Sequence, residues 1–270
     1  MPVIDFHVHT FPDAIAERAV KKLADISGIT PSTDGTVGAT LPVLRHARVD
    51  TGVSLNIATS PKQMHTINDH AAVLNRELGG RLISFGSVHP DAPDAVEELR
   101  RIKQLGLPGI KLHPDYQGFM VDEERLFPIY EMCGELGLPI VFHAGWDCYS
   151  PELIHNPPAR SARVAKLFPR TRMVLAHLGG LKQWDEVERH LCGLENVYFD
   201  TAIIASYIDP AQAVRVMRNH PADHVLLGSD CPWEDPAVSV AFIENLPVSE
   251  RRKRQILGEN AQRLLRQALQ

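Results

Sequence analysis

The sequence predicts an α/β fold, a (β/α)8 TIM barrel that occupies residues 1–270 as a single domain. Eight short apolar runs rich in β-branched residues recur along the chain, and their centres lie about 32 residues apart, which is the size of one βαβ unit. Several runs are continuously apolar rather than alternating, as expected for parallel strands buried on both faces. Helical patterns separate the runs.

The predicted strands follow one another along the whole chain. They lie at residues 3–9, 52–59, 82–89, 109–113, 139–145, 173–180, 196–200 and 224–230. The long interval 10–51 contains the glycine- and threonine-rich stretch ITPSTDGTVGAT, and we expect it to be a loop over one end of the barrel. An open doubly wound sheet is the alternative fold, but it usually has a glycine-rich turn after the first strand, and this chain has none there.

Two helices between the strands are well marked. Residues 93–105 place apolar side chains three apart, and a second helix follows Asp122, which can cap it. Gly106 and Gly137 stand where these helices must stop, each two residues before a proline. Both helices are therefore expected to pack on the sheet and to end just before the next strand.

Composition narrows the possible classes of function. The 270 residues are 44% hydrophobic and 23% charged, with a net charge of -5, and the only basic run is the short stretch 251–254, so we expect no nucleic-acid or membrane partner. The sequence begins without a basic leader, and no apolar run approaches the roughly 18 residues that span a bilayer. The four cysteines lie far apart without a CxxC pair, which favours free thiols and a cytoplasmic location.

Histidines and aspartates gather at one end of the predicted strands. His7 and His9 are two apart on the first strand, so both side chains leave the same face. The later strands end in His89, His113, His143, His177, Asp200 and Asp230. Because barrel enzymes build their sites at the carboxyl ends of the strands, these groups are expected to share one mouth.

Imidazoles and carboxylates that converge in this way suit a divalent transition metal. We expect one ion, with zinc as the first choice and manganese, iron or cobalt as the other candidates. Such an ion lowers the pKa of bound water towards neutrality, and an unligated histidine nearby could then move protons. The alternative for His7 and His9 is a pair of hydrogen-bonded core histidines, because about 0.6 HxH pairs would arise by chance in a chain with 13 histidines.

The motifs of the chain resemble those of a known family. The motifs are HVH at the start, GIKLHP, VFHAG, VLAHLGG, VYFDT, GSDCPW and ILGENAQRLL. Over nearly its full length the chain is similar to the amidohydrolase-related branch (amidohydrolase 2) of the amidohydrolase superfamily. This branch includes aminocarboxymuconate semialdehyde decarboxylase and related metal-dependent TIM-barrel hydrolases.

The resemblance implies a role for several rim residues. The implied metal ligands are His7, His9, His143 and Asp230. His177 would be the general acid or base, and Asp230 would also relay a proton. Dinuclear members of the superfamily bridge their metals with a carboxylated lysine or a glutamate near the fourth strand, where this chain has Lys111 and His113. The resemblance therefore favours a single metal.

Several neighbouring residues keep more than one interpretation. Lys111 could be a carboxylated bridge, a cation that holds a substrate carboxylate, or a lysine paired with a barrel acid. His113 shares its strand face and either contacts substrate or makes a structural hydrogen bond. Trp146 either walls an apolar pocket or packs within its loop. Asp200 either orients a ligand histidine from behind or caps a helix.

The leading interpretation is a metal-dependent hydrolase that attacks an ester, lactone or amide of a small organic molecule through metal-activated water. The alternative on the same ligands is a nonoxidative decarboxylase of a carboxylated aromatic or muconate-like compound. A catalytically silent metal-binding scaffold is a third hypothesis from another class of function. The expected partner is a small-molecule substrate, and the resemblance also suggests a homodimer.

Overall fold

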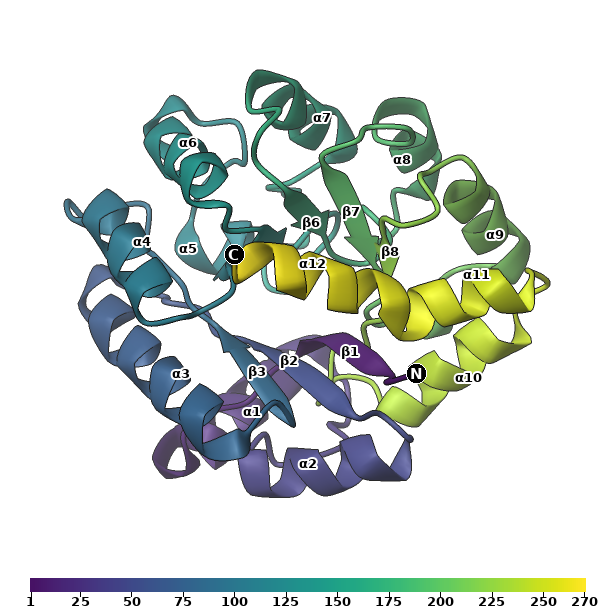
Figure 1. The fold of residues 1–270 in the computed structure, drawn as a ribbon, viewed down its shortest axis with the longest axis horizontal. Coiled ribbons are helices and arrows are strands. Elements are labelled where there is room, and N and C mark those ends of the chain that lie inside the picture. The colour runs from purple at the N-terminus through teal and green to yellow at the C-terminus, as the bar shows by residue number, and fades with distance from the viewer.

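The structure, a computed structural model of residues 1–270, is a closed barrel of eight parallel strands (Figure 1). The strands are β1 (Ile4–Val8), β2 (Thr51–Leu55), β3 (Leu82–Phe85), β4 (Ile110–Leu112), β5 (Ile140–Phe142), β6 (Met173–Leu175), β7 (Val197–Asp200) and β8 (Val225–Leu226). They pair in chain order as a three-stranded and a five-stranded segment. Isolated parallel bridges join the two segments, from Gly86 to Ile110 on one side and from Val8 to Cys231 on the other. The predicted (β/α)8 barrel is therefore confirmed.

Helices surround the strands and connect them (Figure 1). The α-helices are α1 (Asp13–Ser27), α2 (Val37–His46), α3 (Met64–Leu78), α4 (Ala95–Gln104), α5 (Pro114–Gln117), α6 (Phe127–Leu136), α7 (Pro158–Leu167), α8 (Trp184–His190), α9 (Pro210–Arg218), α10 (Pro236–Asn245), α11 (Glu250–Arg254) and α12 (Asn260–Ala268). Short 3-10 turns lie at Pro61–Gln63, Glu124–Leu126 and Ile204–Ser206, and a π-helical turn lies at Gln255–Glu259. None of the helices has both the length and the hydrophobicity that crossing a bilayer requires.

The interval 10–51 is not the predicted loop, because it holds the helices α1 and α2. Pro42 lies inside α2 and weakens the helical signal of the sequence, since proline disfavours helix interiors. The helix forms nevertheless because Thr36 caps it, accepting a hydrogen bond from the Ala39 backbone N–H at 3.1 Å. Leu44 also anchors it by packing in the core. Tertiary packing and a cap thus outweigh the local loop signal.

The two helices marked in the sequence are confirmed. The predicted helix at 93–105 is α4, and the helix expected after Asp122 is α6, which begins at Phe127 after a 3-10 turn. Gly137 ends α6 in a left-handed conformation with φ 68°, and its N–H donates to the carbonyl of Cys133. The glycine therefore stops the helix just before β5, as the sequence indicated.

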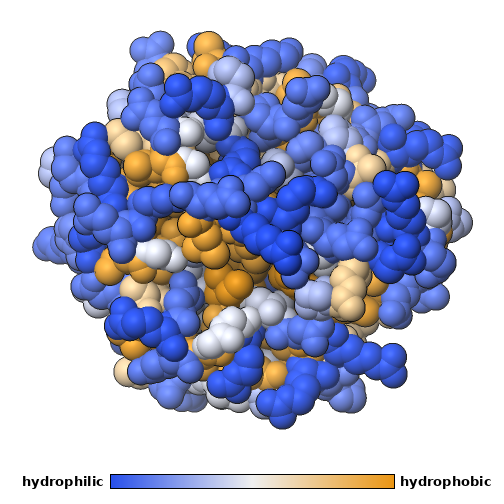
Figure 2. All heavy atoms as spheres, in the orientation of Figure 1, coloured by the Kyte–Doolittle hydropathy of each residue, from blue (hydrophilic) through white to orange (hydrophobic).

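Two apolar clusters hold the barrel together. The larger lies between the strands and the surrounding helices, and the smaller fills the barrel interior. The interior cluster joins Phe6 and Val174 of the strands to Leu264 and Leu265 of α12, so α12 covers the amino-terminal end of the barrel (Figure 1). Figure 2 shows apolar side chains at the centre of this face beside the hydrophilic outer surface of that helix. The carboxyl ends of the strands, with their polar residues, lie at the opposite end.

His220 follows α9, and its side chain links the segment after this helix to β7. Its buried ring stacks on Phe199, and its Nε2 donates to the carbonyl of Val197 at 3.0 Å. Burial lowers the pKa of His220 from 6.5 to about 3. The stability contributed by the neutral ring is therefore complete above pH 6.5 and is lost as the pH falls towards about 3, because the unfolded chain takes up the proton first.

We therefore expect the free energy of unfolding to fall less steeply between pH 6.5 and about 4 in His220→Gln than in the wild type. Urea unfolding at several pH values measures this difference. The matched control is His46→Gln, at an exposed histidine, which should keep the wild-type slope. Equal slopes for His220→Gln and the wild type would contradict the prediction.

Candidate metal centre and active site

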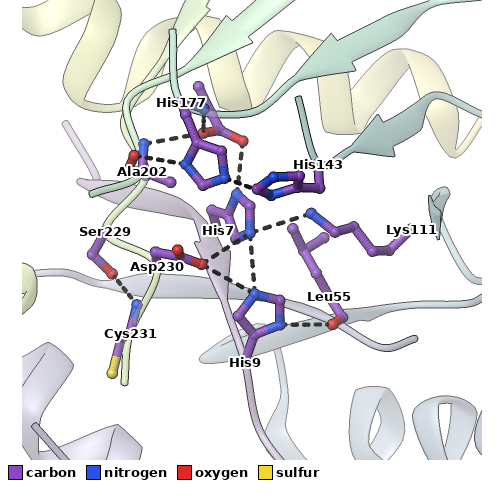
Figure 3. Close-up of polar contacts among 12 residues, drawn as sticks. His7, His9, Leu55, Lys111, His143, His177, Ala202, Ser229, Asp230 and Cys231 are labelled. Carbon is purple, nitrogen blue, oxygen red and sulfur yellow. Dashed lines mark hydrogen bonds and ion pairs between the residues drawn. The ribbon is translucent and has the colours of Figure 1, made fainter. Parts of the chain in front are cut away.

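An irregularity in β1 directs His7 and His9 into the mouth of the barrel. The register with β2 shifts between Asp5 and Val8, which gives β1 one extra residue at this point. The extra residue resets the alternation of side chains, so that Phe6 packs in the interior cluster while His7 enters the mouth (Figure 3). His7 and His9 then point to the same side, as their spacing predicted.

His7, His9 and Asp230, here called the first donor group, bring three donor atoms together (Figure 3). His7 Nε2 lies 3.2 Å from His9 Nε2 and 3.2 Å from Asp230 Oδ1, and His9 Nε2 lies 3.1 Å from the same oxygen. Donor atoms about 2.1 Å from a tetrahedral ion lie about 3.4 Å apart. The observed spacing is therefore close to that of a metal site.

The contacts behind the two rings determine which nitrogen carries the proton. His7 Nδ1 lies 2.9 Å from Asp200 Oδ2, and His9 Nδ1 lies 3.1 Å from the Leu55 carbonyl oxygen. Because a carboxylate and a carbonyl only accept, each Nδ1 donates and each Nε2 presents a lone pair. Two lone pairs and the carboxylate of Asp230 then face one another without a proton between them. The first donor group therefore fits a divalent metal ion.

Burial and charge set the protonation of these groups. Burial, together with the nearby ammonium of Lys111, lowers the pKa of His7 to about 4, so its ring is neutral at pH 7. Burial would raise the pKa of Asp230, but the positive charge that the rings of His7 and His9 carry when protonated holds it well below its usual range. Burial also lowers the pKa of Lys111 to about 8, and its Nζ lies 3.4 Å from His7 Nε2. An ionised carboxylate and a neutral imidazole thus lie beside a protonated lysine at neutral pH.

Asp200 holds the backbone after β6 in place. Its Oδ1 accepts from the backbone N–H of His177 at 3.2 Å and of Ala202 at 3.0 Å, and its carbonyl accepts from Leu178 N–H at 2.6 Å. His177 and Leu178 have φ of 60° and 55°, left-handed conformations that non-glycine residues rarely adopt. Such strained backbone is typical of functional sites. Asp200 thus contacts both the ring of His7 and the segment that presents His177.

His143 does not join the first donor group in this structure. Its Nδ1 lies 3.0 Å from His177 Nε2, and its Nε2 lies 3.4 Å from Asp147 Oδ2. His177 is engaged at both ring nitrogens, because its Nδ1 lies 2.9 Å from the Ala202 carbonyl oxygen. Whether His143 binds the ion of the first donor group therefore stays a prediction.

His113, His143 and Asp147, here called the second donor group, gather beside the first. His113 Nε2 lies 3.6 Å from Asp147 Oδ2, and Asp115 Oδ2 lies 3.9 Å from His113 Nδ1. Sequence reasoning missed both aspartates. Their spacing could have indicated them, because Asp115 follows a rim histidine by two residues and Asp147 follows another by four.

The other predicted residues lie around the two donor groups. Lys111 is fully buried on β4. The ring of His113 stacks on Tyr116, with 3.7 Å between centroids and 4° between planes. Trp146 lies on the loop after β5, and the Lys182 ammonium stands 3.4 Å from its ring centroid. An aromatic ring thus covers one face of His113, and a cation lies over the ring of Trp146.

Among curated proteins, the chain is similar to a decarboxylase. The chain is 27% identical over 230 residues to 2-amino-3-carboxymuconate-6-semialdehyde decarboxylase from Dictyostelium discoideum. The match covers 72% of this chain and 64% of that protein, so the chain spans less than two thirds of the relative's length.

Solved structures of similar fold include two named decarboxylases. With 5-carboxyvanillate decarboxylase from Sphingomonas paucimobilis the TM-score is 0.72 at 18% identity, over 98% of this chain and 99% of that one. The second is dihydroxybenzoic acid decarboxylase from Polaromonas sp., solved with bound manganese and the inhibitor 2-nitroresorcinol. Its TM-score is 0.71 at 17% identity, and the match covers 98% of this chain and 97% of that one. At these identities the likeness establishes the fold.

These comparisons correct the expected reaction. The curated relative and both of these solved structures are named as decarboxylases, so the hydrolase interpretation of the sequence is wrong. The error has a chemical reason, because the same histidine and aspartate ligands serve either reaction and the fold does not dictate the chemistry. The decarboxylase alternative is the one that the comparisons support.

Residues 4–267 match a family model described as amidohydrolase. The matched region includes both donor groups, Lys111 and Asp200. It confirms the resemblance that the motifs indicated. This chain therefore belongs to the amidohydrolase family of metal-dependent TIM-barrel enzymes.

Proposed function

We propose that this protein is a metal-dependent nonoxidative decarboxylase of a small carboxylated aromatic or unsaturated acid. The likeness to the curated decarboxylase from Dictyostelium discoideum carries the proposal. The mouth of the barrel supports it, because an anionic substrate needs positive charge and the departing carboxylate must be replaced by a proton. The mouth offers the positive charge through Lys111 and through an ion at the first donor group, and it offers the proton through His177. These groups lie within a few ångströms of one another.

The first donor group would hold one divalent ion, zinc or manganese. A bound ion supplies positive charge that attracts the substrate and stabilises negative charge developing on its oxygen atoms. Asp200 and the Leu55 carbonyl keep His7 and His9 in the tautomer that can bind it. The manganese in the Polaromonas structure is the reason to test that ion beside zinc.

The reaction replaces a carboxylate by a hydrogen atom. A proton adds to the carbon that carries the carboxylate, the bond between the two carbons breaks, its electron pair stays with the substrate, and carbon dioxide leaves. We assign the delivery of this proton to His177. Its Nδ1 donates to Ala202, so Nε2 is the atom that exchanges a proton. His143 Nδ1 can return a proton to it from 3.0 Å when His143 Nε2 takes up another one from the mouth, so that the His143 ring stays neutral. Asp230, whose carboxylate lies in the same mouth, is the second residue that we assign to proton transfer.

Lys111, His113 and Trp146 are proposed to hold the substrate. An anionic group at the first donor group would meet the Lys111 ammonium, which lies 3.4 Å from His7 Nε2. Trp146 offers a flat ring face against which an aromatic acid can pack. The ring of His113 stacks between Tyr116 and His143, so His113 would contact the substrate through its edge. The aromatic inhibitor in the Polaromonas structure supports a substrate of this shape.

The test is an assay of the untagged protein loaded with Mn²⁺ or Zn²⁺ on a panel of aromatic and unsaturated acids, including 5-carboxyvanillate and 2,6-dihydroxybenzoate. We expect release of carbon dioxide and, in D2O, one deuterium at the vacated carbon by NMR. Protein stripped of metal is the control and should be inactive. No carbon dioxide from any acid, with ester or lactone turnover by the loaded protein, would contradict the proposal.

A further inference from the structure

We propose that Asp5 is a positioning residue for the metal ligands of the first donor group. These ligands come from two segments that are far apart in the chain, namely β1 with His7 and the segment after β8 with Asp230. Asp5 on β1 and Ser229 after β8 are 224 residues apart, and hydrogen bonds join them in the core. The inference rests on the ion that the proposed function assigns to the first donor group, and it does not depend on the reaction.

The carboxylate of Asp5 contacts both segments. Its Oδ1 accepts from the backbone N–H of His7 at 3.1 Å and from that of Ser229 at 2.9 Å. Its Oδ2 accepts from the Ser229 hydroxyl, whose oxygen in turn accepts from the Cys231 N–H at 3.0 Å (Figure 3). The residues on either side of Asp230 are thus joined to β1 through a single carboxylate.

The backbone after β8 is no longer a regular strand where it passes β1. β8 ends at Leu226, and Asp230 adopts a left-handed conformation with φ 69°. The N–H of Ser229 donates to no backbone carbonyl, and Asp5 Oδ1 is its partner. Because buried N–H groups nearly always have a partner, the side chain of Asp5 replaces a bond that a regular strand would make with its neighbour.

The two segments also approach each other closely at this point. A Cβ atom at Gly228 would lie 3.0 Å from the Cβ of His7, so the glycine permits the approach. Asp5 is 1% exposed and Ser229 is 0% exposed. In a close-packed interior a shift of one segment is transmitted to the other. The Asp5–Ser229 pair therefore fixes the separation between the segments as well as their individual paths.

This separation matters because the donors that it brings together repel each other. The lone pair of His7 Nε2 lies 3.2 Å from the carboxylate oxygen Oδ1 of Asp230. If the backbone were free to move, these two acceptors would separate, and an ion would then have to draw them together as it bound. Functional groups of a site need to be held within about 0.5 Å of their working positions. The Asp5–Ser229 pair thus strengthens metal binding by preorganising the site.

The test is the Zn²⁺ dissociation constant of the untagged full chain, measured by competition with a chelating indicator. We expect Ser229→Ala to weaken binding by roughly 10-fold and Asp5→Ala by roughly 100-fold, the two ends of the range for partners behind metal ligands. Asp5→Asn should lose less affinity than Asp5→Ala, because its amide oxygen can still accept from both backbone N–H groups.

The double variant Asp5→Ala/Ser229→Ala distinguishes a coupled pair from two independent contacts. If the two side chains act together, the double variant should bind Zn²⁺ only slightly more weakly than Asp5→Ala, whereas independent effects would multiply to roughly 1000-fold. If Asp5→Ala does not fold, Asp5→Asn takes its place in the same comparison.

The matched control is Asn260→Ala. Asn260 is 0% exposed, and its amide donates to the carbonyls of Ala222 and Val225 at the other end of β8. Thermal unfolding should show that this control is destabilised, as the Asp5 and Ser229 variants are, but its Zn²⁺ affinity should equal that of the wild type. A purely structural role for Asp5 would lower stability in all of these variants and leave the affinity of each unchanged.

Wild-type affinity in Ser229→Ala and Asp5→Asn, an equal loss of affinity in Asn260→Ala, or multiplied effects in the double variant overturns the proposal. A wild type that binds no Zn²⁺, or that binds it no more tightly than Asp230→Asn, would refute the metal site itself and the positioning role with it. The readout is binding and not turnover, so a failure of the proposed decarboxylation would leave these results unchanged.

Discussion

Asp230→Asn is expected to lose the ion of the first donor group and to lower turnover by roughly 100-fold or more, since even partners behind metal ligands are worth 10–100-fold. The Asp230 carboxylate lies 3.2 and 3.1 Å from the Nε2 atoms of His7 and His9, so removing its charge removes a ligand and the counter-charge together. Asparagine tolerates the left-handed backbone at this position, where φ is 69°. The measurements are metal content by elemental analysis and carbon dioxide release.

Asp200→Asn provides the graded comparison. Its single side-chain oxygen can accept either from His7 Nδ1 or from the backbone N–H groups of His177 and Ala202, and not from both sides, so the metal affinity should fall by roughly 10–100-fold. Both variants replace a buried carboxylate by its neutral isostere, which controls for the loss of charge alone. If Asp230→Asn kept the metal content of the wild type while Asp200→Asn lost it, the assignment of Asp230 as a ligand would be refuted.

The strands could be predicted from the sequence because burial on both faces leaves a direct record in continuous apolar runs. The helix α1 has a helical pattern in its sequence, with buried Ala16 and Val20 four residues apart, and its assignment to a loop was wrong. The helix α2 could not be predicted, because Gly38 and Pro42 give residues 37–46 the local signal of a loop. The helix depends on contacts made at a distance in the sequence, such as the packing of Leu44 in the core. The local sequence of this segment favours a loop, but its tertiary packing favours a helix, and the packing determines the structure that forms.

The location of the candidate site could also be predicted, whereas its internal contacts could not. His7 and His9 were found because two residues on one strand end leave the same face. The orientation of His143 depends on a side-chain rotation that sequence spacing does not encode. Asp115 and Asp147 lie on loops after strands, where spacing gives only proximity. The separation into two donor groups therefore emerges only from the folded chain.

His177→Asn is expected to lower kcat by roughly 10²–10⁴-fold, the usual contribution of a general acid or base, and to leave the ion of the first donor group bound. The ring nitrogens of His177 contact Ala202 and His143, not the first donor group, so the metal ligands keep their contacts. Asparagine again tolerates the backbone, where φ is 60°. Carbon dioxide release at saturating substrate measures kcat, and elemental analysis measures the metal.

The two readouts together separate three roles for His177. A large loss of kcat with full metal content is the behaviour of a proton donor, because binding of the ion and of the substrate remains while the step that replaces the carboxylate fails. Loss of metal together with kcat would identify His177 as a ligand. An unchanged kcat would transfer the proton step to Asp230, the other group in the mouth that we assign to it. His89→Asn should keep both kcat and metal content, because His89 lies outside both donor groups.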